Sequence, residues 1–167
     1  MSIVWRDKVL SSYNGNIESV IVHDVAEGVA GAEVQVPNGV FVTLDGLAGV
    51  GREVKKAVLA EDATADVLLI STPEVFYETG KELDDFVNEA GAVARAFRLA
   101  DGDVITLTED LLNEKPTAVG DRYAVGAKGK LVALAEEAEA VVTFVVREDA
   151  RNELTRKQNA WRFDVVK

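Results

Sequence analysis

The amino-acid sequence predicts a mainly β protein with one helix, built as an antiparallel β-barrel or sandwich with an extended N-terminal arm. Valine is the commonest residue type and outnumbers leucine, and β-branched side chains favour pleated, half-buried surfaces over helix interiors. Short apolar or alternating runs recur along the chain, separated by Asn-Gly, Asp-Gly and Gly-rich turns that are typical of hairpins. Only one stretch has sustained helical spacing.

Each expected strand is a short apolar or alternating run with turn-forming residues beside it. The runs are residues 18–23, 32–36, 40–44, 54–59, 66–71, 94–99, 104–108, 122–125, 131–135, 141–146 and 161–166. The turns between them include residues 37–39, 45–46, 101–103, 120–121 and 126–129. We expect these turns to join neighbouring strands as antiparallel hairpins, because tight turns of this composition reverse the chain direction.

The single predicted helix covers residues 79–90. Thr79 and Glu82 have the spacing of a capping box at its start, and Gly91 marks its end. Apolar residues recur inside it at helical spacing, namely Leu83, Phe86, Val87 and Ala90. A second, short turn is expected over residues 109–113, before Pro116.

Residues 1–16 show neither clean alternation nor a helical stripe. One interpretation makes them an ordinary edge strand whose aromatic side chains lie in the core. The other makes them an arm that docks on another protein through Trp5 and Tyr13, because large aromatic side chains are strong interface anchors. Arg6 and Lys8 would add contacts to an acidic partner. On the second interpretation the chain divides into an arm at 1–16 and a single β-rich domain at 17–167.

The composition excludes several classes of function. The chain has 167 residues and a net charge of −11, which argues against binding to the phosphate backbone of nucleic acids. The absence of cysteine excludes disulfides, thiolate nucleophiles and cysteine-ligated metals, and the lone histidine, His23, excludes a multi-histidine centre. We expect no membrane span, because no run approaches the roughly 20 apolar residues that one needs, and no signal peptide is apparent.

Charge is distributed unevenly along the chain. Residues 1–16 carry +1 and residues 147–167 carry +2, so residues 17–146 hold −14. An acidic body with mildly basic ends suits a protein that stays soluble at high copy number while its termini meet an acidic partner. The alternative interpretation is a solvated acidic surface with no particular role.

No group of residues has the pattern of a catalytic or metal site. The paired carboxylates at 84–85, 101–103 and 136–139 fit a helix start, a turn and an exposed loop. His23 lies beside Asp24 without a nucleophile motif, and the glycines at 46–51 lack the P-loop spacing. The acidic stretch 61–66 lacks the ligand spacing of an EF-hand. We therefore predict no catalytic residue, cofactor or metal ligand, and leave a structural calcium ion open.

Several segments resemble those of capsid decoration (cement) proteins from the heads of tailed bacteriophages. The first is Val36-Pro-Asn-Gly-Val-Phe-Val-Thr-Leu-Asp45. The second runs from Thr79–Gly91 into Phe97-Arg-Leu-Ala-Asp-Gly-Asp-Val-Ile-Thr106, and the third is Val119-Gly-Asp-Arg-Tyr123 followed by a Gly-rich hairpin. The resemblance spans roughly residues 17–167 as a pattern of spacing and turn types.

This resemblance implies a non-enzymatic virion protein, made in the host cytoplasm, that binds the major capsid protein on the outer surface of an icosahedral shell. Such proteins clamp neighbouring capsid subunits, and many hold the shell with a terminal arm. The resemblance assigns no individual residues; on the arm interpretation the expected partner-binding residues are Trp5, Arg6, Lys8 and Tyr13. A second copy of the chain is a further expected partner. Two alternatives stay open: a non-catalytic binding module, such as a tail or adhesin domain or an inhibitor, and an enzyme with a carboxylate site.

Overall fold

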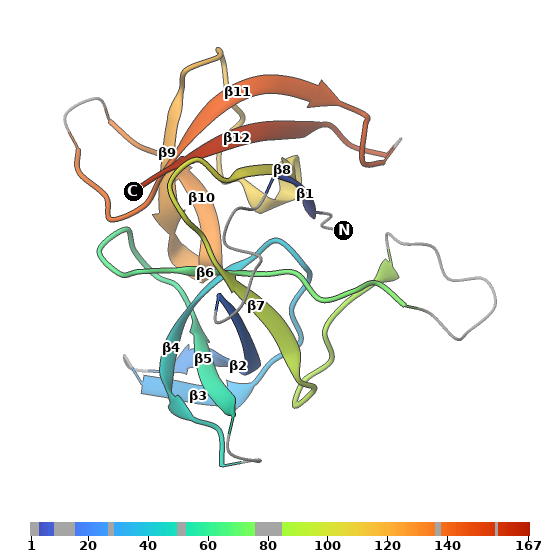
Figure 1. Ribbon diagram of the computed structural model, residues 1–167, viewed down its shortest axis with the longest axis vertical. Helices are drawn as coiled ribbons and strands as arrows, with labels where there is room; N and C mark the ends of the chain where they lie inside the picture. Colours follow the sequence, from blue (N-terminus) through green and yellow to red (C-terminus); the bar gives the residue numbers. More distant parts are fainter. Residues whose placement is uncertain are drawn as a thin grey trace.

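The computed structural model describes residues 4–8, 16–26, 29–49, 53–75, 85–135, 138–155 and 157–167. Within these ranges the chain forms twelve strands in two sheets of six (Figure 1). The strands are β1 Val4–Lys8, β2 Ile17–Ala26, β3 Val29–Glu33, β4 Phe41–Leu47, β5 Val54–Leu59, β6 Leu68–Ile70, β7 Ala94–Arg98, β8 Val104–Thr108, β9 Arg122–Gly126, β10 Lys130–Ala133, β11 Thr143–Arg151 and β12 Ala160–Val166.

The first sheet closes into a five-stranded barrel. Its order is β2-β5-β4-β6-β7, and β7 pairs back onto β2, with Ile17 opposite Phe97. Strand β3 pairs antiparallel with the last residues of β2. The predicted barrel is thus confirmed, but the purely antiparallel arrangement is wrong at one place, because β2 and β5 run parallel from Ser19 opposite Val54 onward.

The second sheet is antiparallel throughout and has the order β1-β8-β12-β11-β9-β10. In Figure 1 it lies above the barrel, and the β11–β12 hairpin extends to one side. Strands β1 and β10 are therefore the two edges of this sheet.

The two sheets pack on one hydrophobic core. Phe41 of β4 and Phe144 of β11 lie with their ring centroids 4.9 Å apart, across the junction between barrel and sheet. The β9–β10 turn (η3, Ala127–Gly129) presses against the barrel, where the Gly129 amide donates to the Ala60 carbonyl at 2.7 Å. A side chain at Gly129 would overlap the backbone of Phe41, so glycine is required for this close approach.

Most expected strands are confirmed to within a few residues, whereas several expected hairpin turns are wrong. The turn at 45–46 lies inside β4, where the register with β5 shifts as in a β-bulge. The turn at 101–103 joins the barrel strand β7 to β8 of the other sheet. The 126–129 turn does join a hairpin, β9–β10, and the short turn expected at 109–113 is the 3-10 helix η2, Glu109–Leu111.

The predicted helix over 79–90 is wrong in the part that the structure describes. After a single 3-10 residue at Asp85, residues 86–90 are not helical, and Asn88 instead forms a β-bridge with Val36. Residues 79–84, which hold the capping box, lie outside the described residues. No helix in the described part of the chain is long and apolar enough to cross a membrane.

Candidate functional site

Three of the four predicted partner-binding residues lie in β1, at the edge of the second sheet. Its backbone runs antiparallel to β8, with Trp5 opposite Thr106 and Lys8 opposite Val104, and the register shifts between these two pairs. Val4 is partly buried against the core. The described part of the predicted arm is therefore an edge strand and not an extended arm. The fourth residue, Tyr13, lies outside the described residues.

Strand β8, which β1 covers, is the most enclosed strand of the second sheet. All five of its residues are buried. Ile105 and Leu107 belong to the hydrophobic core, whereas the Thr106 hydroxyl accepts a hydrogen bond from Arg162 Nε at 3.2 Å. Since β12 occupies one edge of β8 and β1 the other, β1 completes the shielding of a strand that is buried on both faces.

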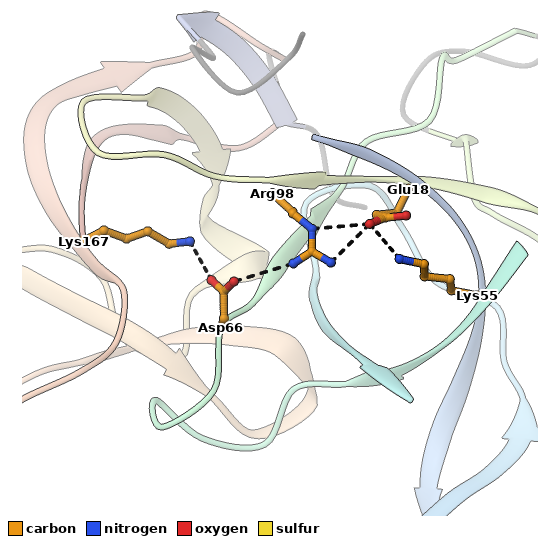
Figure 2. Close-up of polar contacts among 5 residues, drawn as sticks. All are labelled: Glu18, Lys55, Asp66, Arg98 and Lys167. Carbon is orange, nitrogen blue, oxygen red and sulfur yellow. Dashed lines mark hydrogen bonds and ion pairs between the residues drawn. The ribbon is translucent and has the colours of Figure 1, made fainter. Parts of the chain in front are cut away.

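A chain of alternating charges ties the barrel to the end of β12 (Figure 2). Glu18 Oε1 lies 2.9 Å from Lys55 Nζ and 3.1 Å from Arg98 Nη2. The other end of the Arg98 guanidinium lies 3.7 Å from Asp66 Oδ2, and Lys167 Nζ contacts Asp66 Oδ1 at 2.6 Å. No local sequence pattern predicts this network, because its members come from five separate segments.

The centre of this network is Glu18, whose side chain is only 15% exposed. Burial by itself would raise the pKa of Glu18, but the hydrogen bonds from Lys55 and Arg98 outweigh burial and hold that pKa below its ordinary value. Glu18 is thus a carboxylate that is kept ionised by two cations. This arrangement connects three strands of the barrel and leaves no proton for acid–base chemistry at neutral pH.

A second polar cluster fixes the base of a long excursion between β6 and β7. The buried side chain of Asn38 donates to the Thr72 carbonyl at 2.8 Å and accepts from the Thr72 amide at 2.9 Å. Asn88, also buried, donates to the Val36 carbonyl and to Asn38 Oδ1. Three chain segments, at residues 36–38, 72 and 88, therefore meet at this base.

Beyond this base, the described parts of the excursion project away from the barrel in Figure 1. Val75 and Val93, which lie in its two described parts, are 54% and 51% exposed. Residues 76–84 lie outside the described residues. The described parts of the excursion are thus anchored at their base by hydrogen bonds, and each of them exposes an apolar side chain.

Two of the carboxylates considered as catalytic candidates, Asp101 and Asp103, serve local structure. Asp103 is fully buried and accepts the Ala100 amide at 2.8 Å, while Asp101 accepts the Lys167 amide at 3.2 Å. Asp84, Glu136 and Glu137 lie outside the described residues. The pair 101–103 therefore closes the turn between the two sheets.

His23 lies inside β2, not at its end, and its Nδ1 is 3.1 Å from the Gly31 carbonyl. In the acidic stretch 61–66, Asp62 accepts bonds from the amide and the hydroxyl of Thr64, and these hydrogen bonds lower the pKa of Asp62. Among the described residues, no three His, Asp or Glu side chains gather as potential metal ligands.

A cleft with a volume of about 370 Å³ lies between the 114–121 loop and the start of β9. Asp121 accepts the amides of Ala118 and Thr117, and these bonds lower the pKa of Asp121. Tyr123 donates to the Glu114 carbonyl, and burial raises the pKa of Tyr123. Asp121 and Tyr123 of this cleft are thus engaged in holding its own loop.

Comparisons with known proteins identify no relative: no family model, curated protein or solved structure matches this chain.

Proposed function

We propose that this protein is a structural virion component that decorates the outer surface of an icosahedral phage capsid and stabilises the shell by binding the major capsid protein. The proposal rests on the resemblance of residues 36–45, 79–106 and 119–123 to decoration proteins of tailed phages. The proposal includes that the protein has no catalytic activity and no cofactor. It also includes that the protein is made in the host cytoplasm and then located on the capsid surface.

The observation that best supports this role is the way the two sheets are locked into one body. Phe41 and Phe144 pack across the junction, and Gly129 bonds to Ala60 at the same place. The ion pair of Asp66 with Lys167 adds a connection from the barrel to the end of β12. A protein that braces neighbouring capsid subunits must resist shear between its own halves, and a shared close-packed core provides that resistance.

The surface also suits a stable, abundant particle component. The body between residues 17 and 146 carries −14, whereas the segment that contains β1 carries +1. Like-charged bodies repel one another and stay soluble, while a basic edge strand can approach an acidic neighbour. Trp5, Arg6 and Lys8 are the residues proposed to contact that neighbour.

One observation favours the second candidate, a non-catalytic binding module. The excursion between β6 and β7 is anchored by Asn38 and Asn88 and exposes Val75 and Val93. A fixed projection with apolar flanks suits recognition of any protein partner, not only a capsid subunit.

The test is electron cryomicroscopy of phage heads produced with and without this chain. The expected result is additional density of the size of an 18.0 kDa protein on the outer capsid surface, present only with the chain, and shells that withstand less heat without it. Density confined to the tail would instead support the binding module. Absence of the chain from purified particles would refute both the capsid role and the virion location.

A further inference from the structure

The edge of β8 on which β1 lies is a site that accepts a strand, and the structure shows which sequence it accepts. We propose that β1 of one molecule can occupy this edge on a second copy, so that neighbouring copies are joined by exchange of their first strand. The occupant is thus a second copy of this chain, bound through residues Val4–Lys8. This inference concerns association between copies and does not depend on capsid binding.

The first argument is the need of β8 for a neighbour. All the residues of β8 are buried: Val104 is the most exposed of them, at 5%, and Thr106 follows at 1%. If β1 left, the backbone groups along this edge of β8 would lose their partners, and buried unpaired backbone groups are costly. The edge therefore has to be covered by a strand, from the same chain or from another.

The second argument is the limited attachment of β1 to its own chain. Strand β1 pairs only with β8 among the described strands, through a short ladder with a register shift between Trp5 and Lys8. The next element, β2, belongs to the barrel and not to this sheet. Leaving the sheet consequently breaks few hydrogen bonds, and an identical edge on a second copy restores every one of them.

The third argument is charge. Residues 1–16 carry +1, whereas the body that a second copy presents carries −14 between residues 17 and 146. The first strand is therefore attracted to the acidic body of any copy, its own or another, so charge does not oppose its transfer although the two bodies repel each other.

The test uses single-cysteine variants, because the chain has no cysteine of its own. Lys8→Cys is mixed with Val104→Cys, two positions that lie opposite each other in the ladder. A disulfide between the two variants forms rapidly only when β1 of one molecule pairs with β8 of the other. At about 10 µM protein, chance collision should form it about 100-fold more slowly than the millimolar effective concentration within an exchanged pair.

The matched control mixes Lys8→Cys with Val132→Cys, which lies on β10 at the opposite edge of the same sheet. We expect a non-reducing gel to show a covalent dimer, of twice the 18.0 kDa chain mass, from the first mixture and not from the control. A dimer yield equal to the control would overturn the proposal. Trp5→Cys with Thr106→Cys repeats the test if Val104→Cys does not fold.

The double variant Lys8→Cys/Val104→Cys shows whether the two positions meet at all. If the double variant forms its disulfide within single chains and the mixed single variants form no dimer, β1 stays paired with β8 of its own chain. That result overturns the proposal. If the double variant closes neither within nor between chains, the β1–β8 register is wrong and the proposal fails with it.

Discussion

The substitution Gly129→Ala tests how tightly the two sheets are joined. Gly129 has a φ of +64°, and a Cβ there would lie 2.9 Å from the Phe41 nitrogen, 3.1 Å from its carbonyl carbon and closer still to its oxygen. A left-handed conformation costs an alanine about 1–2 kcal/mol. Overlap with backbone atoms that cannot rotate away adds about 1–3 kcal/mol. The expected loss of unfolding free energy is therefore about 2–5 kcal/mol.

The matched control is Gly120→Ala, because Gly120 has a φ of +96° and no atom within 4 Å of the added Cβ. It should cost only the conformational part, about 1–2 kcal/mol. Urea unfolding followed by circular dichroism measures both variants. If Gly129→Ala loses no more stability than Gly120→Ala, the close approach of the β9–β10 turn to β4 does not hold the sheets together, and the reasoning is refuted.

Two further predictions concern the polar clusters. Because the pKa of Glu18 is lowered on folding, its ion pairs stabilise the protein above the ordinary pKa of 4.5, and this stabilisation disappears as the pH falls through the lowered value. Glu18→Gln should thus lower the free energy of unfolding by about 1 kcal/mol at pH 7 after solvent screening. Urea titrations at several pH values should show that the difference in unfolding free energy between the variant and the unchanged protein disappears at acid pH. A difference that stays constant with pH would contradict the role of the Glu18 charge. Asn38→Ala should cost about 1–3 kcal/mol, because it leaves the partly buried backbone groups of Thr72 without their side-chain partner. Amide hydrogen exchange at Thr72 should then be faster, and unchanged exchange there would contradict the anchoring role of Asn38.

Local patterns predicted the strands well, because alternation and turn residues are local properties. The runs at 54–59 and 104–108 coincide with β5 and β8. The helix over 79–90 failed in its described part, since helical spacing describes only neighbours along the chain. Asn88 makes its decisive contacts with Val36 and Asn38, about 50 residues away.

The pairing of distant strands could not be predicted in the same way. Turn residues indicate which consecutive strands form hairpins. The parallel pairing of β2 with β5 and the antiparallel pairing of β1 with β8 instead join segments that are far apart in the sequence. The aromatic and basic residues of the first segment left two interpretations open, and the structure favours the edge strand for Val4–Lys8. The network around Glu18 has no periodic signal at all, because charged surface residues occur at many positions.

The division of the chain between the sheets has a consequence for the order of folding. The barrel draws its strands from one continuous stretch, Ile17 to Arg98, whereas β1 precedes that stretch and pairs with β8, which follows it. During synthesis at about 5–20 residues per second, the barrel strands emerge from the ribosome before β8 exists. Strand β1 therefore waits for its partner while all the barrel strands are made. For about 0.5–2 s, while residues 99–108 are added, a new chain holds every barrel strand and an unpaired β1.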